Sequence, residues 1–384
     1  MESYIVLRSS AGSRQSLKRA SGGAANTTSI VTERLTQHAA AGLSRDPEVL
    51  AITRPMMTKL ITPLPSAVGS SISGDAWGIF AVGAHQTSYT GAGVTIAVLD
   101  TGIDRSHPSF AGLNIKEQDF TGEGNGDLDG HGTHCAGTIF GQDVGGRRIG
   151  VARGIGQALI GKVLGQNGGS SEILFEGLQW AVRERANIIS MSLGFDFPGA
   201  VEEKIQAGWP ADLATSEALE TYRGNLRLLD ALMGMFKAQS AFNSAPLVIA
   251  AAGNESRRAI NKDYKIAASL PAAAEGVLSV AAASVVGNLY GIADFSNSLP
   301  KLTAPGVDVV SAQPGGNLQA MSGTSMACPY VAGVAALWWQ RLQEARAPNL
   351  ALAVAAHLTA NARNECFSPD LDASDFGYGM VTSP

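Results

Sequence analysis

The sequence predicts an α/β fold of three layers (α/β/α), in which helices cover both faces of a mainly parallel central sheet. From about residue 76, short apolar runs rich in β-branched residues alternate with runs of helical length, and glycine-containing turns separate them. The apolar runs, such as VTIAVLD at 94–100 and PLVIAAAGN at 246–254, lack the polar alternation of a strand with one face in water. Strands of this kind are buried on both faces, as in parallel sheets covered by helices.

The individual elements follow from these runs in chain order. Strands are expected at 94–100, 158–164, 187–194, 246–254 and 276–284, and helices at 131–141, 172–185 and 325–345. Residues 195–240 form a long insertion between two strands, with the apolar spacing of one or two packed helices. Since the insertion begins just after a strand end, we also consider that it walls part of a ligand cleft.

Residues 1–75 have a different organisation. A strand is expected at 3–9, a Ser/Gly/Ala-rich loop at 10–29, a helix at 30–46 with Thr32 as a possible cap, and a strand at 48–61 bent at Pro55. A Pro/Gly/Ser-rich stretch then marks a boundary. We therefore divide the chain into a small α+β segment (1–65), a linker (66–75) and a large domain (76–384).

Composition excludes several classes of protein. The formal net charge is −5 with no long basic run, so no nucleic-acid partner is expected. No stretch has the length and apolarity needed to cross a bilayer, and the first residues lack a signal-peptide pattern. We therefore expect a cytoplasmic protein without a membrane partner, with secretion left open. Three cysteines, Cys135, Cys328 and Cys366, are too few for a disulfide framework.

Three polar residues suggest nucleophilic catalysis. Asp100 ends a predicted strand in AVLDTGID, His131 opens a predicted helix in DGHGTHCAGT, and Ser325 opens another in SGTSMACPYVAG. A serine hydroxyl needs an adjacent base, which His131 can supply, while an acid such as Asp100 orients the imidazole. Backbone N–H groups at the start of the Ser325 helix point to where an oxyanion would form. Read singly, each of these residues is more often a turn residue or a helix cap.

The order Asp, His, Ser and the neighbours of each residue resemble the subtilisin-like serine proteases (subtilases, peptidase S8 family), and the resemblance covers residues 76–384. It implies a serine endopeptidase with a catalytic triad and an acyl-enzyme intermediate. It also implies that the side chain of Asn254, in VIAAAGNES, completes the oxyanion hole with Ser325. The substrate-binding residues implied in the same way are Gly168, Gly169, Ser170, Ser192, Leu193, Gly194, Ala252 and Gly253.

The first 65 residues resemble a subtilase propeptide of the inhibitor I9 type. This resemblance implies a self-processing zymogen whose own N-terminal segment is an intramolecular inhibitor; the alternative is an accessory segment that is never removed. No cofactor is expected. Structural calcium is common in the family but not supported here, because Ser109 stands where an acidic ligand is often found and Arg147 and Arg148 would repel a cation. The acid-rich stretch 123–129 is the remaining place for a weak site.

Two other functions remain open from the sequence. One is a maturation protease dedicated to a single precursor peptide, and the other is a non-catalytic subtilase-like scaffold that binds peptides. His134, one turn after His131, is expected to be structural, and His107 is expected to be a loop residue. A zinc site at His131 and His134 is not favoured, because no glutamate follows the first histidine. Cys135 and Cys328 are expected to be buried neighbours near the site.

Overall fold

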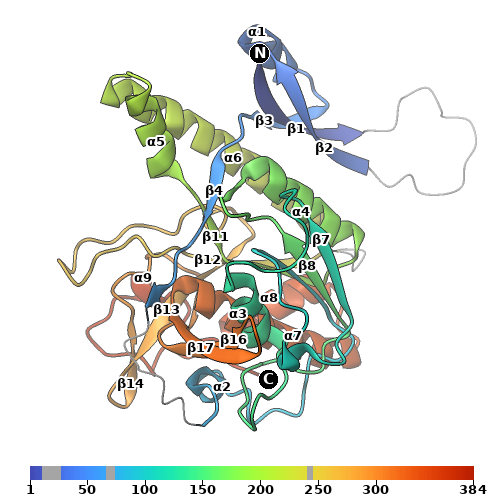
Figure 1. Ribbon diagram of the computed structural model, residues 1–384, viewed down its shortest axis with the longest axis vertical. Coiled ribbons are helices and arrows are strands. Elements are labelled where there is room, and N and C mark those ends of the chain that lie inside the picture. Colours follow the sequence, from blue (N-terminus) through green and yellow to red (C-terminus); the bar gives the residue numbers. More distant parts are fainter. Residues whose placement is uncertain (11–26, 66–73, 240–244) are drawn as a thin grey trace, which may run out of the picture.

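A computed structural model describes residues 1–10, 27–65, 74–239 and 245–384 (Figure 1). Most of the loop predicted at 10–29 and most of the linker predicted at 66–75 lie outside these residues. The part of the chain that the structure describes contains no helix that is both long and apolar enough to cross a membrane.

The central sheet has eight strands in the order β14-β13-β12-β10-β6-β8-β7, with β15 beside β13. Every pair of neighbours is parallel except β13 and β14. The strands are β6 (Thr95–Asp100), β7 (Ile115–Asp119), β8 (Gln157–Lys162), β10 (Ile188–Met191), β12 (Leu247–Ala251), β13 (Leu278–Val286), β14 (Leu289–Ile292) and β15 (Leu302–Pro305). The predicted strands are all present, and the predicted mainly parallel sheet is confirmed.

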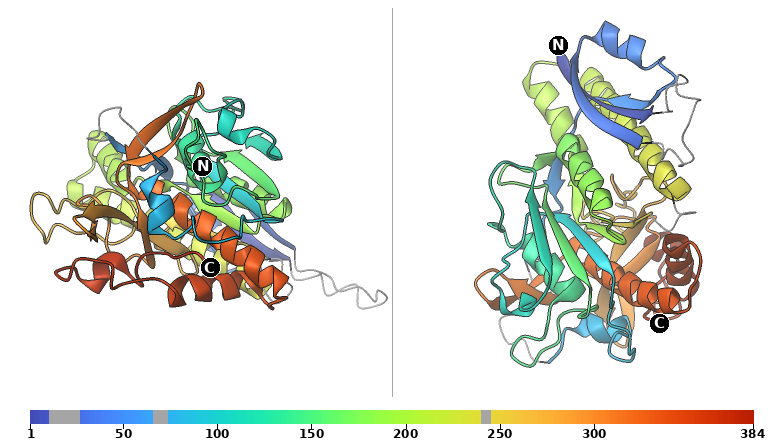
Figure 2. Two further views of the ribbon diagram at one scale, coloured as in Figure 1. Left: turned by 90° about the horizontal axis from the view of Figure 1, so that it is seen from below. Right: turned by 90° about the vertical axis from the view of Figure 1, so that its right-hand side faces the viewer.

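Helices cover both faces of this sheet (Figures 1 and 2). Along β6, Ile96 and Val98 are buried in one core with α3 and α7, whereas Ala97 and Leu99 are buried in a second core with α4 and α6. The three-layer fold is therefore confirmed. The helices are α2 (Trp77–Ala81), α3 (His131–Phe140), α4 (Ser171–Arg183), α5 (Phe197–Gln206), α6 (Ala211–Gln239), α7 (Thr324–Glu344), α8 (Leu350–Ala360) and α9 (Ala373–Phe376), with a short 3-10 turn, η1 (Pro108–Phe110).

The N-terminal segment forms its own antiparallel sheet in the order β2-β1-β3, with one helix. Its elements are β1 (Glu2–Ser10), β2 (Thr27–Leu35), α1 (Gln37–Leu43) and β3 (Val49–Thr53). The predicted helix at 30–46 is wrong in its first half, because the β-branched run at 30–32 pairs with β1 as part of β2. Thr36, not Thr32, caps the helix, since its hydroxyl accepts the Ala39 N–H at 3.2 Å.

The end of the segment leaves this small sheet and pairs with the large domain. The strand β4 (Met57–Leu60) lies antiparallel between β9 (Gly169–Ser170) and β11 (Leu193–Phe195). The strand β5 (Leu64–Pro65) then adds to β17 (Asn317–Ser322), whose other neighbour is β16 (Val309–Gln313). In Figure 1 the segment sits above the large domain, and β4 runs down from it into that domain.

Candidate active site

The Asp100 and His131 side chains meet at the carboxyl edge of the parallel sheet. Asp100 is the last residue of β6, and His131 is the first residue of α3. The Nδ1 atom of His131 lies 2.7 Å from Oδ1 of Asp100, and both side chains are buried. The Thr101 N–H donates to the same carboxylate oxygen at 2.8 Å, which fixes the acid relative to the ring. This geometry leaves Nε2 of His131 as the nitrogen that faces the rest of the site.

A second acid, Asp127, ties the end of β6 to the start of α3. Its Oδ1 accepts the Thr101 hydroxyl at 2.9 Å, and its Oδ2 accepts the Thr133 N–H at 2.9 Å and the Thr133 hydroxyl at 2.6 Å. The Asp127 carboxylate therefore holds both Thr101, which follows Asp100, and Thr133, which lies two residues after His131. The sequence analysis treated Asp127 only as part of an acid-rich stretch, and its role depends on a contact across 26 residues.

Ser325 occupies the second position of α7, and Pro329 explains how its carbonyl is used. A helical residue normally donates its N–H to the carbonyl four residues earlier, but proline has none. The carbonyl of Ser325 instead accepts the Ser192 hydroxyl at 3.1 Å and the Cys135 thiol at 3.4 Å. Helix α7 begins at Thr324, so this proline lies in its second turn.

The Ser325 hydroxyl faces the N-terminal segment. It lies 3.3 Å from the carbonyl oxygen of Ile61 and 3.4 Å from that of Ser192. Among the described residues, Nε2 of His131 has no hydrogen-bond partner. The structure thus brings Asp100 to His131, while the serine–histidine hydrogen bond is not made when the segment lies in the site.

Asn254 reaches the same stretch of the segment, three residues after β12. Its Nδ2 donates to the carbonyl of Thr62 at 3.2 Å. Its Oδ1 accepts the backbone N–H and the hydroxyl of Thr324, both at 2.9 Å, so the amide is held with Nδ2 toward the segment. The sequence analysis missed this orienting contact of Thr324.

The segment binds the two predicted edge segments as an added strand. Thr58 pairs with Gly169 on one side and with Phe195 on the other, and Lys59 pairs with Gly194. The Ile61 side chain is 3% exposed and packs against Gly194, where a Cβ would lie 3.5 Å from its Cγ1. The predicted residues that contact or adjoin this strand are Gly168, Gly169, Ser170, Ser192, Leu193 and Gly194.

Ala252 and Gly253 have a different role in the contacts seen here. The carbonyl of Ala252 accepts the Asn297 side-chain amide at 3.0 Å, and the Gly253 N–H donates to the Thr324 hydroxyl at 3.1 Å. Both residues therefore support the turn that carries Asn254. The next residue after Asn254, Glu255, is exposed and accepts the Asn297 side-chain amide at 2.8 Å.

Burial and neighbouring groups set the protonation of the two buried histidines. Burial lowers the pKa of His131, but the hydrogen-bonded Asp100 carboxylate and the adjacent Cys135 together raise this pKa well above its ordinary value. Burial lowers the pKa of His134 to about 4. Its Nε2 lies 2.9 Å from the carbonyl of Val309 and 3.2 Å from that of Gln319, so the structural role predicted for this ring agrees with its contacts.

Similarity to known proteins identifies the family of this chain. The model of the subtilase family matches residues 91–380. The chain belongs to the subtilase family. It is 36% identical over 256 residues to a subtilisin-like protease of Coccidioides posadasii (64% of this chain, 52% of the relative) and 34% identical over 272 residues to subtilisin-like protease 6 of Trichophyton rubrum (68% and 57%). It is 35% identical over 257 residues to the major intracellular serine protease of Bacillus subtilis (64% and 68%). The chain thus spans little more than half of the two fungal relatives.

Two of the three cysteines of this subtilase, Cys135 and Cys328, are buried as predicted. The Cys135 sulfur lies 3.8 Å from Nδ1 of His131. Within the described residues, Asp100, His131 and Cys135 are one group compact enough to hold a metal ion, with ligand atoms within 4.8 Å of one another. Burial raises the pKa of the Cys135 thiol, and a protonated thiol is a poor metal ligand.

The acid-rich stretch before His131 is already used by protein donors. Glu123 lies 3.2 Å from the Lys162 ammonium, Asp127 accepts the Gly130 N–H at 2.8 Å, and Asp129 accepts the His131 N–H at 3.3 Å. His107, expected in a loop, lies in the bend just before the η1 turn; it is buried there, and its Nε2 lies 2.9 Å from the carbonyl of Asn317.

Proposed function

We propose that this subtilase is a serine endopeptidase in which Asp100, His131 and Ser325 form the catalytic triad. The observation that carries the proposal is the 2.7 Å contact between Asp100 and His131 beside a serine whose hydroxyl lies 3.3 Å from a carbonyl of a bound peptide segment. In the neutral form of the ring, Asp100 holds the imidazole proton on Nδ1, so that Nε2 is free to accept a proton.

The reaction follows from these positions. The Ser325 oxygen attacks the carbonyl carbon of the substrate while Nε2 of His131 takes the hydroxyl proton. The oxyanion is stabilised by the Asn254 amide and the Ser325 backbone N–H. His131 then gives the proton to the leaving amine, which breaks the peptide bond and leaves an acyl-serine. Water, activated by His131, hydrolyses this ester and restores the serine.

Substrate binding in this proposal is strand addition. The backbone of β4 between β9 and β11 supports it, because main-chain hydrogen bonds on both sides hold a chain without regard to its sequence. The Ile61 side chain fills the pocket against Gly194, so the pocket takes an apolar residue just before the cleaved bond.

In the same proposal, residues 1–61 are the inhibitory prosegment, and Ile61–Thr62 is the bond that the enzyme cleaves in itself. Ile61 contributes the carbonyl nearest the Ser325 hydroxyl, whereas Asn254 donates to the next carbonyl, that of Thr62. The oxyanion donor is therefore one residue out of register with the nucleophile. A segment bound in this way blocks the cleft, and the Asn254 amide must reach the Ile61 carbonyl before it can stabilise the oxyanion for cleavage of the Ile61–Thr62 bond.

Mass spectrometry of the purified chain tests this function. The wild-type chain is expected to convert to a product that begins at Thr62 and reacts with a fluorophosphonate at Ser325. The Ser325→Ala variant is expected to stay full length and unlabelled. A fully active enzyme with an intact N-terminus would refute the prosegment, and a folded wild-type chain that neither reacts with the probe nor cleaves any peptide would refute the endopeptidase.

A further inference from the structure

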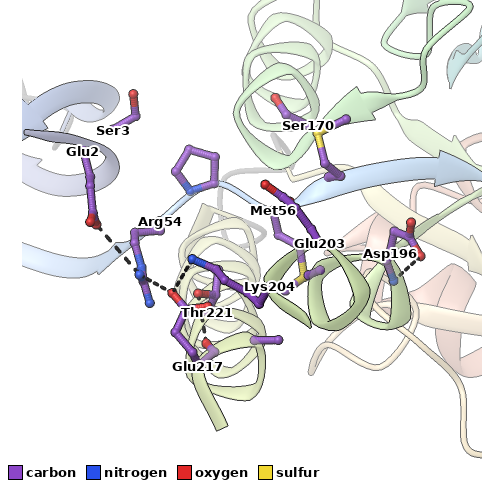
Figure 3. Close-up of a pocket in the computed structure, with 15 residues that line it drawn as sticks. Glu2, Ser3, Arg54, Met56, Ser170, Asp196, Glu203, Lys204, Glu217 and Thr221 are labelled. Carbon is purple, nitrogen blue, oxygen red and sulfur yellow. Dashed lines mark hydrogen bonds and ion pairs between the residues drawn. The ribbon is translucent and has the colours of Figure 1, made fainter. Parts of the chain in front are cut away.

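The insertion between β11 and β12 contacts the N-terminal segment far from the Ser325 hydroxyl. In Figures 1 and 2 its helices α5 and α6 extend from the large domain beneath the β1–β3 sheet. Between the insertion and the segment lies a cavity of about 560 Å³, shown in Figure 3. The charged side chains that line it from the insertion are Asp196, Glu203, Lys204 and Glu217, and those from the segment are Glu2 and Arg54. The insertion therefore presents three acids and one base to the segment.

Arg54 of the segment binds one of these acids, Glu217. Its guanidinium forms an ion pair with Glu217, and Glu2 lies 3.8 Å away on the other side. The side chains of Arg54 and Glu217 are only 26% and 19% exposed, so the pair is partly shielded from water. Lys204 lies 3.6 Å from Glu217 and helps to hold the carboxylate in place.

A buried side-chain amide of α6 binds the backbone of the N-terminal segment at the same position. Asn225 has no exposed surface, and its Nδ2 donates to the carbonyl of Arg54 at 3.0 Å. A side chain on Gly224 would collide with Thr53, so the helix approaches the segment closely at this point. One face of α6 carries the residues that lie against the segment, namely Glu217, Thr221, Gly224 and Asn225. The shape of this face therefore suits an extended chain.

The number of residues between Arg54 and Ile61 determines which residue of a bound chain reaches the acids of the insertion. Arg54 stands seven residues before Ile61, and β4 between them is held in register by β9 and β11. Nearer the site, the Lys59 ammonium donates to Asp196 at 2.7 Å. A chain with its apolar residue in the Ile61 pocket therefore brings the residue seven positions earlier to Glu217.

We propose that the α5–α6 insertion is an exosite that selects substrates with an arginine seven residues before the residue in the Ile61 pocket. This inference rests on the proposed function and adds a substrate class to it: extended basic segments of proteins, such as precursor peptides, rather than short apolar sequences. The prosegment occupies the exosite first, and substrates of the same pattern follow once it has left.

The test uses the wild-type chain after it has processed itself, with the peptide of residues 53–65 as the probe. The Arg54→Ala form of the peptide is expected to have a kcat/KM about fivefold lower. The Glu217→Gln enzyme is expected to lose about the same factor on the parent peptide and nothing further on the Arg54→Ala peptide, as a double-mutant cycle requires for a direct contact. Glu203→Gln, an acid of the same cavity, is the matched control and is expected to cleave both peptides like the wild type.

Equal cleavage of the two peptides by the wild-type enzyme would overturn the exosite, as would equal losses in Glu217→Gln and Glu203→Gln. Cleavage of neither peptide would count against the proposed function instead. In that case the exosite is tested by hydrogen exchange of the full-length Ser325→Ala chain, because this measurement does not require enzymatic activity. Residues 49–54 are expected to exchange faster with Glu217→Gln and unchanged with Glu203→Gln, and no difference between these two variants would refute the surface.

Discussion

The two nitrogens of the His131 ring have very different surroundings. Nδ1 contacts Asp100, while Nε2 has no hydrogen-bond partner among the described residues. Since the ring is fully buried, its charge depends on the single carboxylate beside it. Asp100 thus determines both the orientation of the ring and the pH at which it can accept a proton.

Replacing Asp100 by Asn is expected to lower the pKa of His131, because the Asp100 charge is the largest influence that raises it. Imidazole resonances of the full-length Ser325→Ala chain, followed by NMR during titration, should shift their midpoint to lower pH with Asp100→Asn. In the chain that keeps Ser325, kcat should fall about 10⁴-fold, because the amide holds the wrong tautomer. Asp104→Asn is the control, since Asp104 lies outside the contacts of His131; a midpoint that moves upward in Asp100→Asn would contradict the assignment.

At the level of elements, the parallel sheet and its helices were predictable because their signals are local. Runs such as 94–100 and the glycine turns after them carry the pattern in a few consecutive residues. The helix predicted at 30–46 failed because the strand pairing of residues 30–32 with β1 is set by a partner more than twenty residues away. The triad residues were recognisable from their neighbours, whereas Asp127 and Thr324 act through contacts that no local pattern contains.

In the insertion, too, the local sequence pattern predicted the elements but not their contacts with distant parts of the chain. Its apolar spacing predicted helices, and α5 and α6 confirm them. Asn225 on the buried face of α6 gave no signal, because a polar residue in a helix has meaning only once its partner is known. That partner is the backbone of the segment at Arg54, 171 residues earlier in the chain.

Helix α6 offers a matched pair of glycines that tests this contact. Gly224→Ala should loosen the segment, because the new methyl group meets Thr53, whereas a Cβ at Gly234 meets no atom within 4 Å. Both changes favour the helix by up to about 1 kcal/mol. Hydrogen exchange of the full-length Ser325→Ala chain should therefore speed up at residues 49–53 with Gly224→Ala only. Equal exchange in the two variants would mean that the close approach at Gly224 does not hold the segment.

At the scale of the whole molecule, the segment is attached at two separate places. Figure 1 shows its small sheet above the insertion and β4 descending into the cleft. The inner attachment is mostly backbone hydrogen bonding, while the outer one includes the Arg54–Glu217 pair, and the Lys59–Asp196 pair lies between them. Cutting one peptide bond at Ile61 removes neither attachment. The fragment should therefore stay bound after cleavage, and its release, rather than the cleavage itself, should control when activity begins.

The NaCl concentration is therefore expected to change the lag before activity begins. Raising NaCl from about 0.05 M to about 0.5 M weakens ion pairs that are partly open to solvent, as these two are, so the lag before the processing chain cleaves a peptide substrate should shorten. Backbone hydrogen bonds of β4 respond little to NaCl, so the effect belongs to the two ion pairs. A chain with Lys59→Gln and Glu217→Gln should have a shorter lag at low salt and little further response to salt. A lag that lengthens with NaCl, or the same salt response in this variant, would show that release of the segment does not depend on these pairs.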